Sequence, residues 1–346
     1  MGTDLLGLDA DFVETIREEA RAKYKIADLL VTATHTHSAP PVVSTCAGGS
    51  RDPSFTKWVH DQAMDSFEEA CDHIQPITIH KAQFEVNLNW NRRSRPQYFE
   101  SRKIDNTVNI LEILDKNSEP LVRIVRYTCH PTCFGSYDSK IDPASADFVG
   151  LLRSQLGDMI FLNGCAGYVN PYDHSKQKNE NDPAPDLSGH GYDGADFVAQ
   201  GIFKAFSQVS GKSVDTDSTL KTSRRDHQCR FNTTCSSLRP TKTSPVAAVR
   251  IGSTVLVGLP GEPFEESGSR IKKQTTSDVW VIGYADGYFG YLIDPTAERR
   301  AKEFPNDDYE GGAGQGMASS LIGYRIFASD TALLEDSAIA AVKDTR

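Results

Sequence analysis

Two histidines separated by one residue raise the first question of chemistry in this sequence. His35 and His37 lie in the run VTATHTHSAPP, where an apolar segment ends before two prolines. On an extended backbone, side chains two residues apart point to the same face, so both imidazoles can enter one pocket. Imidazole is a common metal ligand and a general acid or base near neutral pH. An isolated pair is more typical of buried structural histidines, so further partners are needed.

Two other segments supply such partners. His130 follows the alternating segment VRIVRYT and, like the first pair, comes just before a proline. Glu262 follows the apolar segment VLVGLP and a Pro-Gly turn, at the expected start of a helix. A carboxylate there is also explained by the helix dipole. Catalytic zinc sites combine histidines with a carboxylate, and strand-end loops gather such ligands. The three segments fit a zinc site without excluding the structural interpretation.

The elements that must position these residues follow from periodicity. Apolar residues spaced by three or four predict helices, and alternating or continuous apolar runs predict strands. The order of these elements predicts an α/β fold in which a mixed β-sheet core is layered with helices. The expected helices cover residues 12–24, 53–74, 145–156, 196–209 and 264–273, with a long final helix after residue 316. The expected strands cover residues 27–34, 77–86, 106–114, 120–128, 159–163, 220–229, 246–260 and 279–286, and a tight hairpin turn is expected at Gly252 and Ser253 within the range 246–260.

The chain shows no internal repeat and no clear boundary between domains, so residues 1–346 are expected to form a single domain. Residues 172–191 are polar and lack periodicity, which predicts an exposed loop or lid. The opening MGTDLLGLDADF has neither the basic nor the apolar region of a signal peptide, and no run is long and apolar enough to span a membrane. The sequence does not indicate the cellular compartment of the protein.

The composition limits the class of partner. The 346 residues carry a net charge of -10, which disfavours nucleic acids and anionic membranes because both attract positive fields. The seven cysteines form no CxxC pair, and Cys129 and Cys133, which flank His130, are interpreted as small buried hydrophobes. We therefore expect a small-molecule partner.

Seven short stretches give the sequence a family resemblance. ATHTHSAPP, WNRR, TCHPT, NGCAGYVNP, LPGE, YADGYFGYL and DYEGG occur in the order found in the catalytic domain of the neutral/alkaline ceramidase family, between residue 34 and about residue 311. In the family, the first histidine of HTH, a later strand-end histidine, the glutamate of PGE and a tyrosine of an NxYxxY motif hold one zinc ion. The resemblance implies that His35, His130, Glu262 and Tyr291 do so here.

The same resemblance implies groups around the scissile amide that do not bind metal: His37, Arg92 and Tyr309. On the residues alone, Arg92 is better explained as a surface charge, Tyr291 as a core residue and Tyr309 as part of an acidic loop. Compared with the long ceramidases, the chain lacks a C-terminal immunoglobulin-like extension. Its opening resembles the end of the family's first segment, so a first strand is expected to be missing.

The chain departs from the family at one motif. Where ceramidases carry GDxSPN, this sequence has Tyr168 in place of the aspartate and Asn170 in place of the serine. Asparagine cannot form an alkoxide nucleophile, but its amide can donate to an oxyanion or orient a substrate. Water activated by the metal is therefore the expected nucleophile. A second, smaller change places Asp286 where ceramidases show asparagine.

These observations predict a zinc-dependent hydrolase that cleaves an N-acyl amide bond in a small or lipid-like substrate. His37 and Tyr309 are expected to stabilise the oxyanion or carry the proton, while Arg92 and Asn170 orient the substrate. Two alternatives stay open. The first is an esterase, lactonase or peptide-amide hydrolase on the same metal site. The second is an inactive ceramidase-like binding module.

Overall fold

Two five-stranded sheets form the centre of the computed structural model, which describes residues 1–40, 42–44, 51–92, 104–135, 144–179, 182–233, 241–275, 278–293 and 324–346. The first has the strand order β7-β6-β5-β3-β9, and the second has the order β14-β12-β11-β10-β16. Their strands are β3 (Thr78–Glu85), β5 (Thr107–Leu114), β6 (Pro120–Tyr127), β7 (Met159–Asn163), β9 (Ser213–Asp215), β10 (Leu220–Thr233), β11 (Thr241–Ile251), β12 (Thr254–Gly258), β14 (Asp278–Ile282) and β16 (Tyr324–Ile326).

Both sheets are mixed, as the sequence predicts. In the first sheet β5 pairs antiparallel with β3 and β6, whereas β6 and β7 are parallel. In the second, β11 pairs antiparallel with β10 and β12, whereas β12 and β14 are parallel. Three short pairs complete the strands: β1 (Gly2–Thr3) with β2 (Thr32–Ala33), β4 (Asn89–Asn91) with β8 (Val169–Pro171), and β13 (Glu262–Pro263) with β15 (Tyr291–Leu292).

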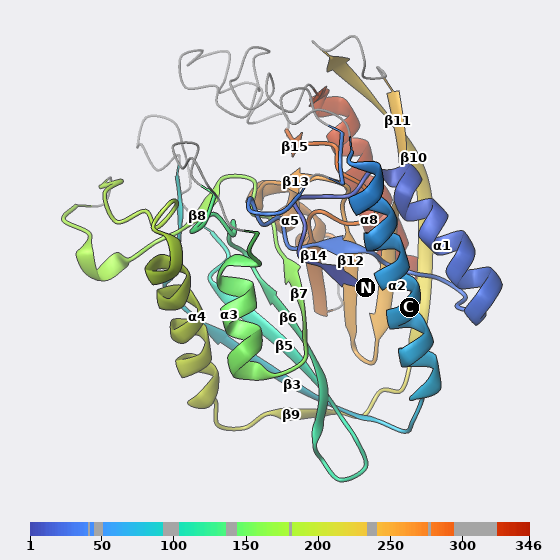
Figure 1. Ribbon diagram of the computed structural model, residues 1–346, viewed down its shortest axis with the longest axis horizontal. Helices are drawn as coiled ribbons and strands as arrows, with labels where there is room; N and C mark the ends of the chain where they lie inside the picture. Colours follow the sequence, from blue (N-terminus) through green and yellow to red (C-terminus); the bar gives the residue numbers. More distant parts are fainter. Residues whose placement is uncertain are drawn as a thin grey trace.

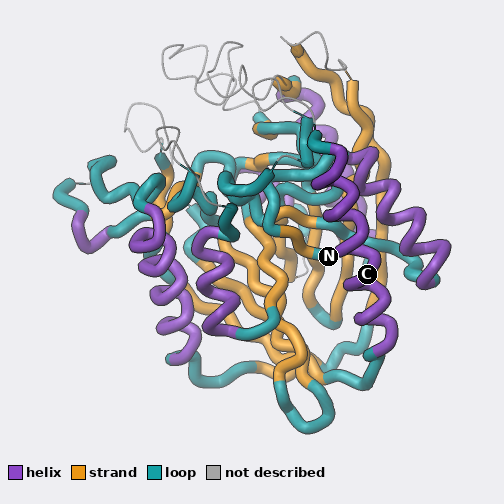
Figure 2. The backbone as a smooth tube through the Cα atoms, in the orientation of Figure 1, coloured by secondary structure: helices purple, strands orange, loops and turns teal. Residues whose placement is uncertain are grey.

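Helices cover the outer face of each sheet, so strands lie between helices in Figure 2. The described helices are α1 (Ala10–Tyr24), α2 (Pro53–Asp72), α3 (Asp147–Leu156), α4 (Gly191–Ser207), α5 (Glu265–Lys273) and α8 (Ala328–Asp344), with a short 3₁₀ turn η1 (His174–Lys176). None of these helices is long and apolar enough to cross a membrane.

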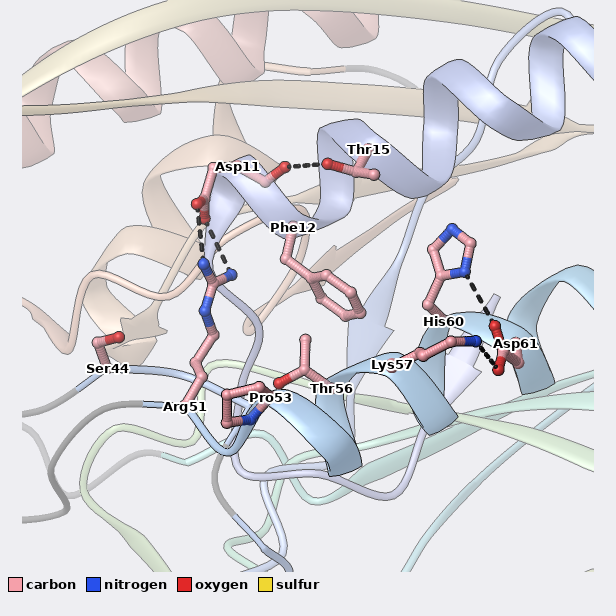
Figure 3. A pocket seen from close by; sticks show the side chains of 10 residues that line it. All are labelled: Asp11, Phe12, Thr15, Ser44, Arg51, Pro53, Thr56, Lys57, His60 and Asp61. Atoms are coloured by element: carbon pink, nitrogen blue, oxygen red, sulfur yellow. Dashed lines mark hydrogen bonds and ion pairs between the residues drawn. The ribbon is translucent and has the colours of Figure 1, made fainter.

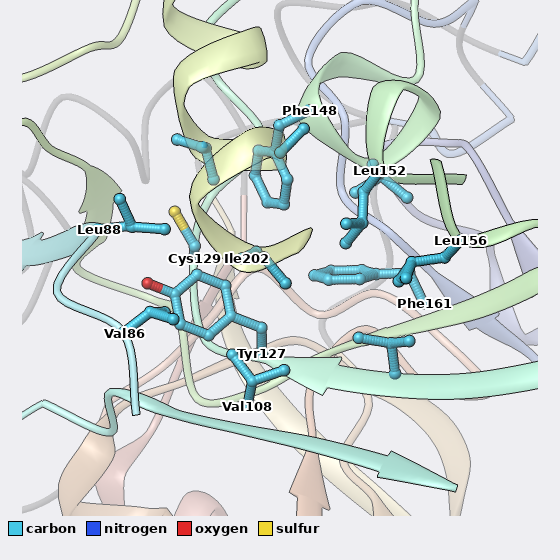
Figure 4. Close-up of a cluster of buried hydrophobic side chains, with 14 of the residues drawn as sticks. Val86, Leu88, Val108, Tyr127, Cys129, Phe148, Leu152, Leu156, Phe161 and Ile202 are labelled. Carbon is cyan, nitrogen blue, oxygen red and sulfur yellow. The ribbon is translucent and has the colours of Figure 1, made fainter. Parts of the chain in front are cut away.

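Alternation along the central strands assigns their side chains to different cores. On β6, Val125 and Tyr127 pack with α3 and α4, as Figure 4 shows for Tyr127. Val122 and Ile124 face the other way, toward Trp280 and other side chains of the second sheet. The outer face of the second sheet packs against α5 and α8. The order of layers is therefore helix, sheet, sheet, helix, and each fully buried large apolar side chain contributes about 1.5–3 kcal/mol.

The structure corrects several expected boundaries. The strand predicted over residues 27–34 is only two residues long, because the backbone N–H of Val31 bonds to the carboxylate of Asp286 and that of Ala33 to the carbonyl of Tyr284. A strand, β16, precedes the final helix, which begins at Ala328. The predicted loop 172–191 contains η1 and the buried Leu187.

The short strands β8, β13 and β15 lie at one end of the molecule, opposite the turn between β5 and β6 (Figure 1). The segments that follow β2, β6 and β12 contact one another at that end through their histidines and a glutamate. The fold therefore brings residues from distant parts of the sequence together there. The prediction of a single domain over residues 1–346 stays a prediction.

Candidate metal centre

His35 and His37 face one site, although not for the expected reason. The backbone at His35 is left-handed, with φ of 71°, so the extended strand ends before it. Two backbone bonds fix this turn: the N–H of Thr34 donates to Thr3 and that of His35 donates to Leu5. The Nδ1 of His35 lies 2.7 Å from the carbonyl oxygen of Leu6, which turns Nε2 inward, 3.3 Å from the Nε2 of His37.

His130 enters the same site from the segment after β6. Its backbone N–H and its Nδ1 both contact the carbonyl oxygen of Val169, at 2.9 and 3.2 Å. The ring is fully buried. Because Nδ1 faces a carbonyl, it carries the proton, and Nε2 is left with a lone pair directed at the centre. The same reasoning applies to His35 beside Leu6.

Glu262 completes the group from β13. Its Oε2 lies 3.5 Å from the Nε2 of His35 and 3.2 Å from the Nε2 of His130. Its Oε1 accepts a 2.6 Å hydrogen bond from the hydroxyl of Tyr288. The carboxylate is almost completely buried, so it depends on these neighbours for its solvation.

The donor set is the one that zinc prefers. The ligand nitrogens of His35, His37 and His130 all lie within 4.8 Å of one another, beside the Glu262 carboxylate. Neither Nε2 of His130 nor Oε2 of Glu262 has a hydrogen-bond partner in the part of the chain that the structure describes. Buried lone pairs of this kind normally have a partner, and a cation would supply one for both.

The protonation states also suit a cation. Burial lowers the pKa of His130 to about 4. Burial, and after it the neighbouring imidazoles of His35 and His130, lower the pKa of His37 well below its ordinary value. His37 and His130 are therefore neutral near neutral pH, and neutral imidazole is the form that binds metal.

The remaining predicted residues are arranged around this group. The Nη2 of Arg92 donates to the hydroxyl of Tyr291 at 3.0 Å, and its Nη1 donates to the amide oxygen of Asn170 at 3.2 Å. Tyr291 lies beside Glu262 in the β13–β15 pair. Its role as a metal ligand stays a prediction. Tyr309 lies outside the described residues.

The periodicity of the sequence gave no functional role to two tyrosines that contact the centre. Tyr288 hydrogen-bonds to Glu262, and the ring of Tyr284 stacks on His35 with centroids 4.2 Å apart. Burial raises the pKa of both phenols well above the ordinary value, so both stay protonated. Their position next to a predicted ligand, in YADGYFGYL, was the available signal. Cys129 and Cys133 are buried in the core, as predicted.

A separate cleft of about 760 Å³ lies at the start of α1 and α2 (Figure 3). None of the predicted site residues lines it. Its charged side chains pair with one another, Arg51 with Asp11 at 3.0 Å and Lys57 with Asp61 at 2.6 Å. The cleft therefore offers no group poised for chemistry, unlike the histidine cluster.

Comparison with known proteins places the fold. No family model matches the chain. The neutral ceramidase of Mycobacterium tuberculosis is 36% identical over 76 residues, which are 20% of this chain and 11% of that protein. The neutral ceramidase structure from Pseudomonas aeruginosa superposes with a TM-score of 0.74 at 18% identity, over 99% of this chain and 66% of that one. A structure of a ceramidase complexed with C2 gives 0.73 at 17% identity, over 99% and 67%.

These likenesses establish the fold. The chain spans about two-thirds of the length of the solved ceramidases that it matches. Its mixed α/β architecture is theirs, and the resemblance carried by the ordered sequence motifs is confirmed at that level. The chain is therefore a divergent protein with a ceramidase-like fold.

Proposed function

We propose that this chain is a zinc-dependent hydrolase that cleaves the amide bond of a small or lipid-like N-acyl substrate. The ceramidase-like fold supports a hydrolase, and one observation carries the proposal further. Nε2 of His130 and Oε2 of Glu262 are buried, 3.2 Å apart, and without a hydrogen-bond partner among the described residues. A resident cation held by His35, His130 and Glu262, with Tyr291 as the fourth proposed ligand, accounts for that arrangement.

When bound, zinc would supply Lewis acidity that polarises a carbonyl and lowers the pKa of water. The chain's own residues set the conditions for it. The carbonyl oxygens of Leu6 and Val169 fix the tautomers of His35 and His130. Tyr288 holds the Glu262 carboxylate in place by its short hydrogen bond.

Proton transfer during hydrolysis is assigned to His37. Its imidazole is neutral at neutral pH because burial lowers its pKa, and its Nε2 faces the other two rings. Its position beside the centre, and not a high basicity, is what supports a role in accepting a proton from the attacking water and returning it to the leaving amine. Tyr309 is proposed to share in stabilising the oxyanion, as the family resemblance implies.

Arg92 and Asn170 are assigned to substrate orientation. Asn170 cannot act as a nucleophile, and its amide oxygen accepts a hydrogen bond from Arg92. The guanidinium is held between Asn170, the carbonyl of Gly167 and the hydroxyl of Tyr291. This places a positive charge close to the centre, where a carbonyl oxygen gains negative charge during hydrolysis.

The test is hydrolysis of N-acyl amides, matched esters and lactones by metal-free protein before and after addition of zinc. We expect zinc-dependent turnover of the amides, with acyl chain and amine varied to define the substrate. Turnover of esters or lactones alone would favour an esterase or lactonase that uses the same metal site. Absence of turnover with every substrate, despite bound zinc, would favour a binding module.

A further inference from the structure

Asp186 lies in the polar segment between η1 and α4, but the backbone of that segment is tied to β8. The N–H of Leu187 donates to the carbonyl of Pro171 at 2.9 Å, and that of Asp173 donates to Pro185 at 3.0 Å. Asp186 itself forms an isolated antiparallel bridge with Tyr172. Its side chain is thus held against the β4–β8 pair.

The carboxylate of Asp186 accepts three hydrogen bonds. Its Oδ2 accepts from the amide Nδ2 of Asn170 at 2.8 Å and from the indole of Trp90 at 3.2 Å. Its Oδ1 accepts from the backbone N–H of Ser188 at 2.9 Å. Trp90 and Asn170 are opposite each other in the β4–β8 register, so one carboxylate binds both strands.

The orientation of the Asn170 amide follows from its two charged neighbours. A carboxylate accepts only, so it must receive the NH₂ group, and a guanidinium donates only, so it must meet the amide oxygen. The 3.2 Å bond from the Nη1 of Arg92 to that oxygen has this geometry. A flipped amide would place its oxygen against the carboxylate and its NH₂ group against the guanidinium, and both hydrogen bonds would be lost. Asp186 therefore determines which end of Asn170 faces Arg92.

We propose that Asp186 is a positioning residue that acts through the amide of Asn170 to hold the guanidinium of Arg92 against Tyr291 at the edge of the metal centre. This inference rests on the proposed function and names a residue that the sequence analysis did not select. A chain of bonds from Asp186 to Tyr291 acts together with the bond from Arg92 to the carbonyl of Gly167 to restrict the rotamers of this long side chain. Asp186 does not touch the centre itself.

A purely structural role for Asp186 is the alternative, because its bonds to Trp90 and Ser188 hold the loop. The two roles differ in one respect. If Asp186 acts only on the loop, its loss costs the same whether or not Asn170 is present. If it acts through Asn170, its loss has little further effect once the amide is gone.

The test is a mutant cycle read by kcat/KM on the amide substrate. Asp186→Ala is expected to lower kcat/KM by about 10- to 100-fold in the wild-type background, and by less than about 3-fold in an Asn170→Ala background. Asp182→Asn is the matched control, since Asp182 binds backbone N–H groups in the same segment and does not reach Arg92. It should change kcat/KM less than about 2-fold. Equal losses from Asp186→Ala in both backgrounds would overturn the proposal.

An exchange of the two side chains tests the polarity of the bonds. Asn170→Asp alone places two carboxylates in contact and should lower kcat/KM at least about 10-fold. Adding Asp186→Asn should restore kcat/KM to within about 5-fold of wild type, because the new carboxylate pairs with Arg92 and the new amide donates to it. Failure of the exchange to recover activity would contradict the inference.

A readout independent of catalysis separates this inference from the proposed function. Asp186→Ala and Arg92→Lys should be coupled in urea unfolding, changing the unfolding equilibrium constant by at least about 2-fold beyond their separate effects. The coupling should vanish in the Asn170→Ala background. If the protein hydrolyses no acyl substrate but shows this coupling, the proposed function fails and the positioning role stands; no coupling with Asn170 present would overturn the positioning role.

Discussion

Two buried carboxylates at neighbouring sites in this molecule have opposite surroundings. Asp286 lies 2.9 Å from the Nη2 of Arg17 and 2.7 Å from the Nη1 of Arg224, and it also accepts the N–H of Val31. Glu262 has only imidazoles and one phenol around it, and no arginine or lysine pairs with it in the described ranges of the chain. Both side chains are 1% exposed.

The difference separates a structural carboxylate from a ligand. A charge removed from water needs compensation, and Asp286 receives it from two fixed guanidinium groups. Glu262 lacks a fixed cation, so the compensation must come from outside the chain. The two are also connected, because Asp286 belongs to the turn that places Tyr284 on His35 and Tyr288 on Glu262. The backbone of that turn is left-handed at Tyr284 and at Asp286, which costs about 1–2 kcal/mol for each residue, and its N–H groups donate to the carbonyls of Gly261, Leu259 and Val31.

The strongest test of this contrast is Glu262→Gln. We expect hydrolysis to fall by about 10³-fold or more, because several kcal/mol of stabilisation depend on the metal. In the presence of chelator at pH 8, however, the variant should be more stable than wild type, by about 1–3 kcal/mol, because an uncompensated buried charge is removed. Urea unfolding with chelator measures this. A large loss of stability would show that Glu262 is a structural carboxylate.

Asp286→Asn should act in the opposite direction. Removing the carboxylate leaves Arg17 and Arg224 without their shared partner, and the free energy of unfolding should fall by about 3–5 kcal/mol. Asp344→Asn provides the control, since its pair with Arg225 is exposed and should contribute almost nothing. Thermal unfolding of both variants measures these effects. Equally small losses of stability would show that the pairs of Asp286 with Arg17 and Arg224 do not stabilise the fold.

His37→Ala distinguishes a proton carrier from a ligand. The distances alone would let His37 join the metal-binding group, because its Nε2 is 3.3 Å from that of His35. Under the proposed roles, the variant keeps its zinc and loses about 10²–10⁴-fold in kcat through loss of acid–base catalysis. The measurement is zinc content beside kcat. Loss of the metal together with activity would reassign His37 as a ligand.

A third buried carboxylate, Asp147 at the start of α3, pairs with no arginine or lysine among the residues that the structure describes, and no metal is expected beside it. Burial raises its pKa to about 6, although the N–H groups of Phe134 and Phe148 oppose this. A folded-state pKa above the ordinary 3.8 means that the folded protein retains a proton that the unfolded chain loses. Stability should therefore fall by about 3 kcal/mol as pH rises from about 4 to 6.

Asp147→Asn tests that dependence. The amide of the variant has one acceptor oxygen where the carboxylate has two, so the variant can be less stable at every pH. The readout is therefore the change of stability with pH. Urea unfolding between pH 4 and pH 7 should show a flatter profile for the variant than for wild type. An unchanged slope would mean that Asp147 does not bind a proton in the folded state.

The sequence predicted the order of the long helices and strands, but it missed the short strands such as β4, β8, β13 and β15. It also placed His35, His130 and Glu262 after predicted strands, and the family resemblance implied that they converge. Periodicity reports which face of an element is buried, and strand ends in layered folds meet at one end. The reason given for the first histidines was wrong, because the left-handed turn at His35 leaves no trace in an alternating pattern.

Other features depend on contacts between residues far apart in the chain. Asp286 pairs with Arg17 from α1 and Arg224 from β10, and no local pattern connects them. Asp186 reached the site only because its loop folds along β8. Likewise, spacing in YADGYFGYL could not tell that Tyr288 would bond to Glu262 while Tyr291 would bond to Arg92.

The central claim is that Glu262, His35 and His130 hold a cation, and zinc content tests it most directly. Protein stripped of metal, exposed to excess zinc and passed through a desalting column should retain one zinc ion per chain. His130→Ala and Glu262→Gln should each retain far less, while Asp182→Asn should match wild type. Wild-type protein that retains no zinc, or variants that retain it unchanged, would contradict the account.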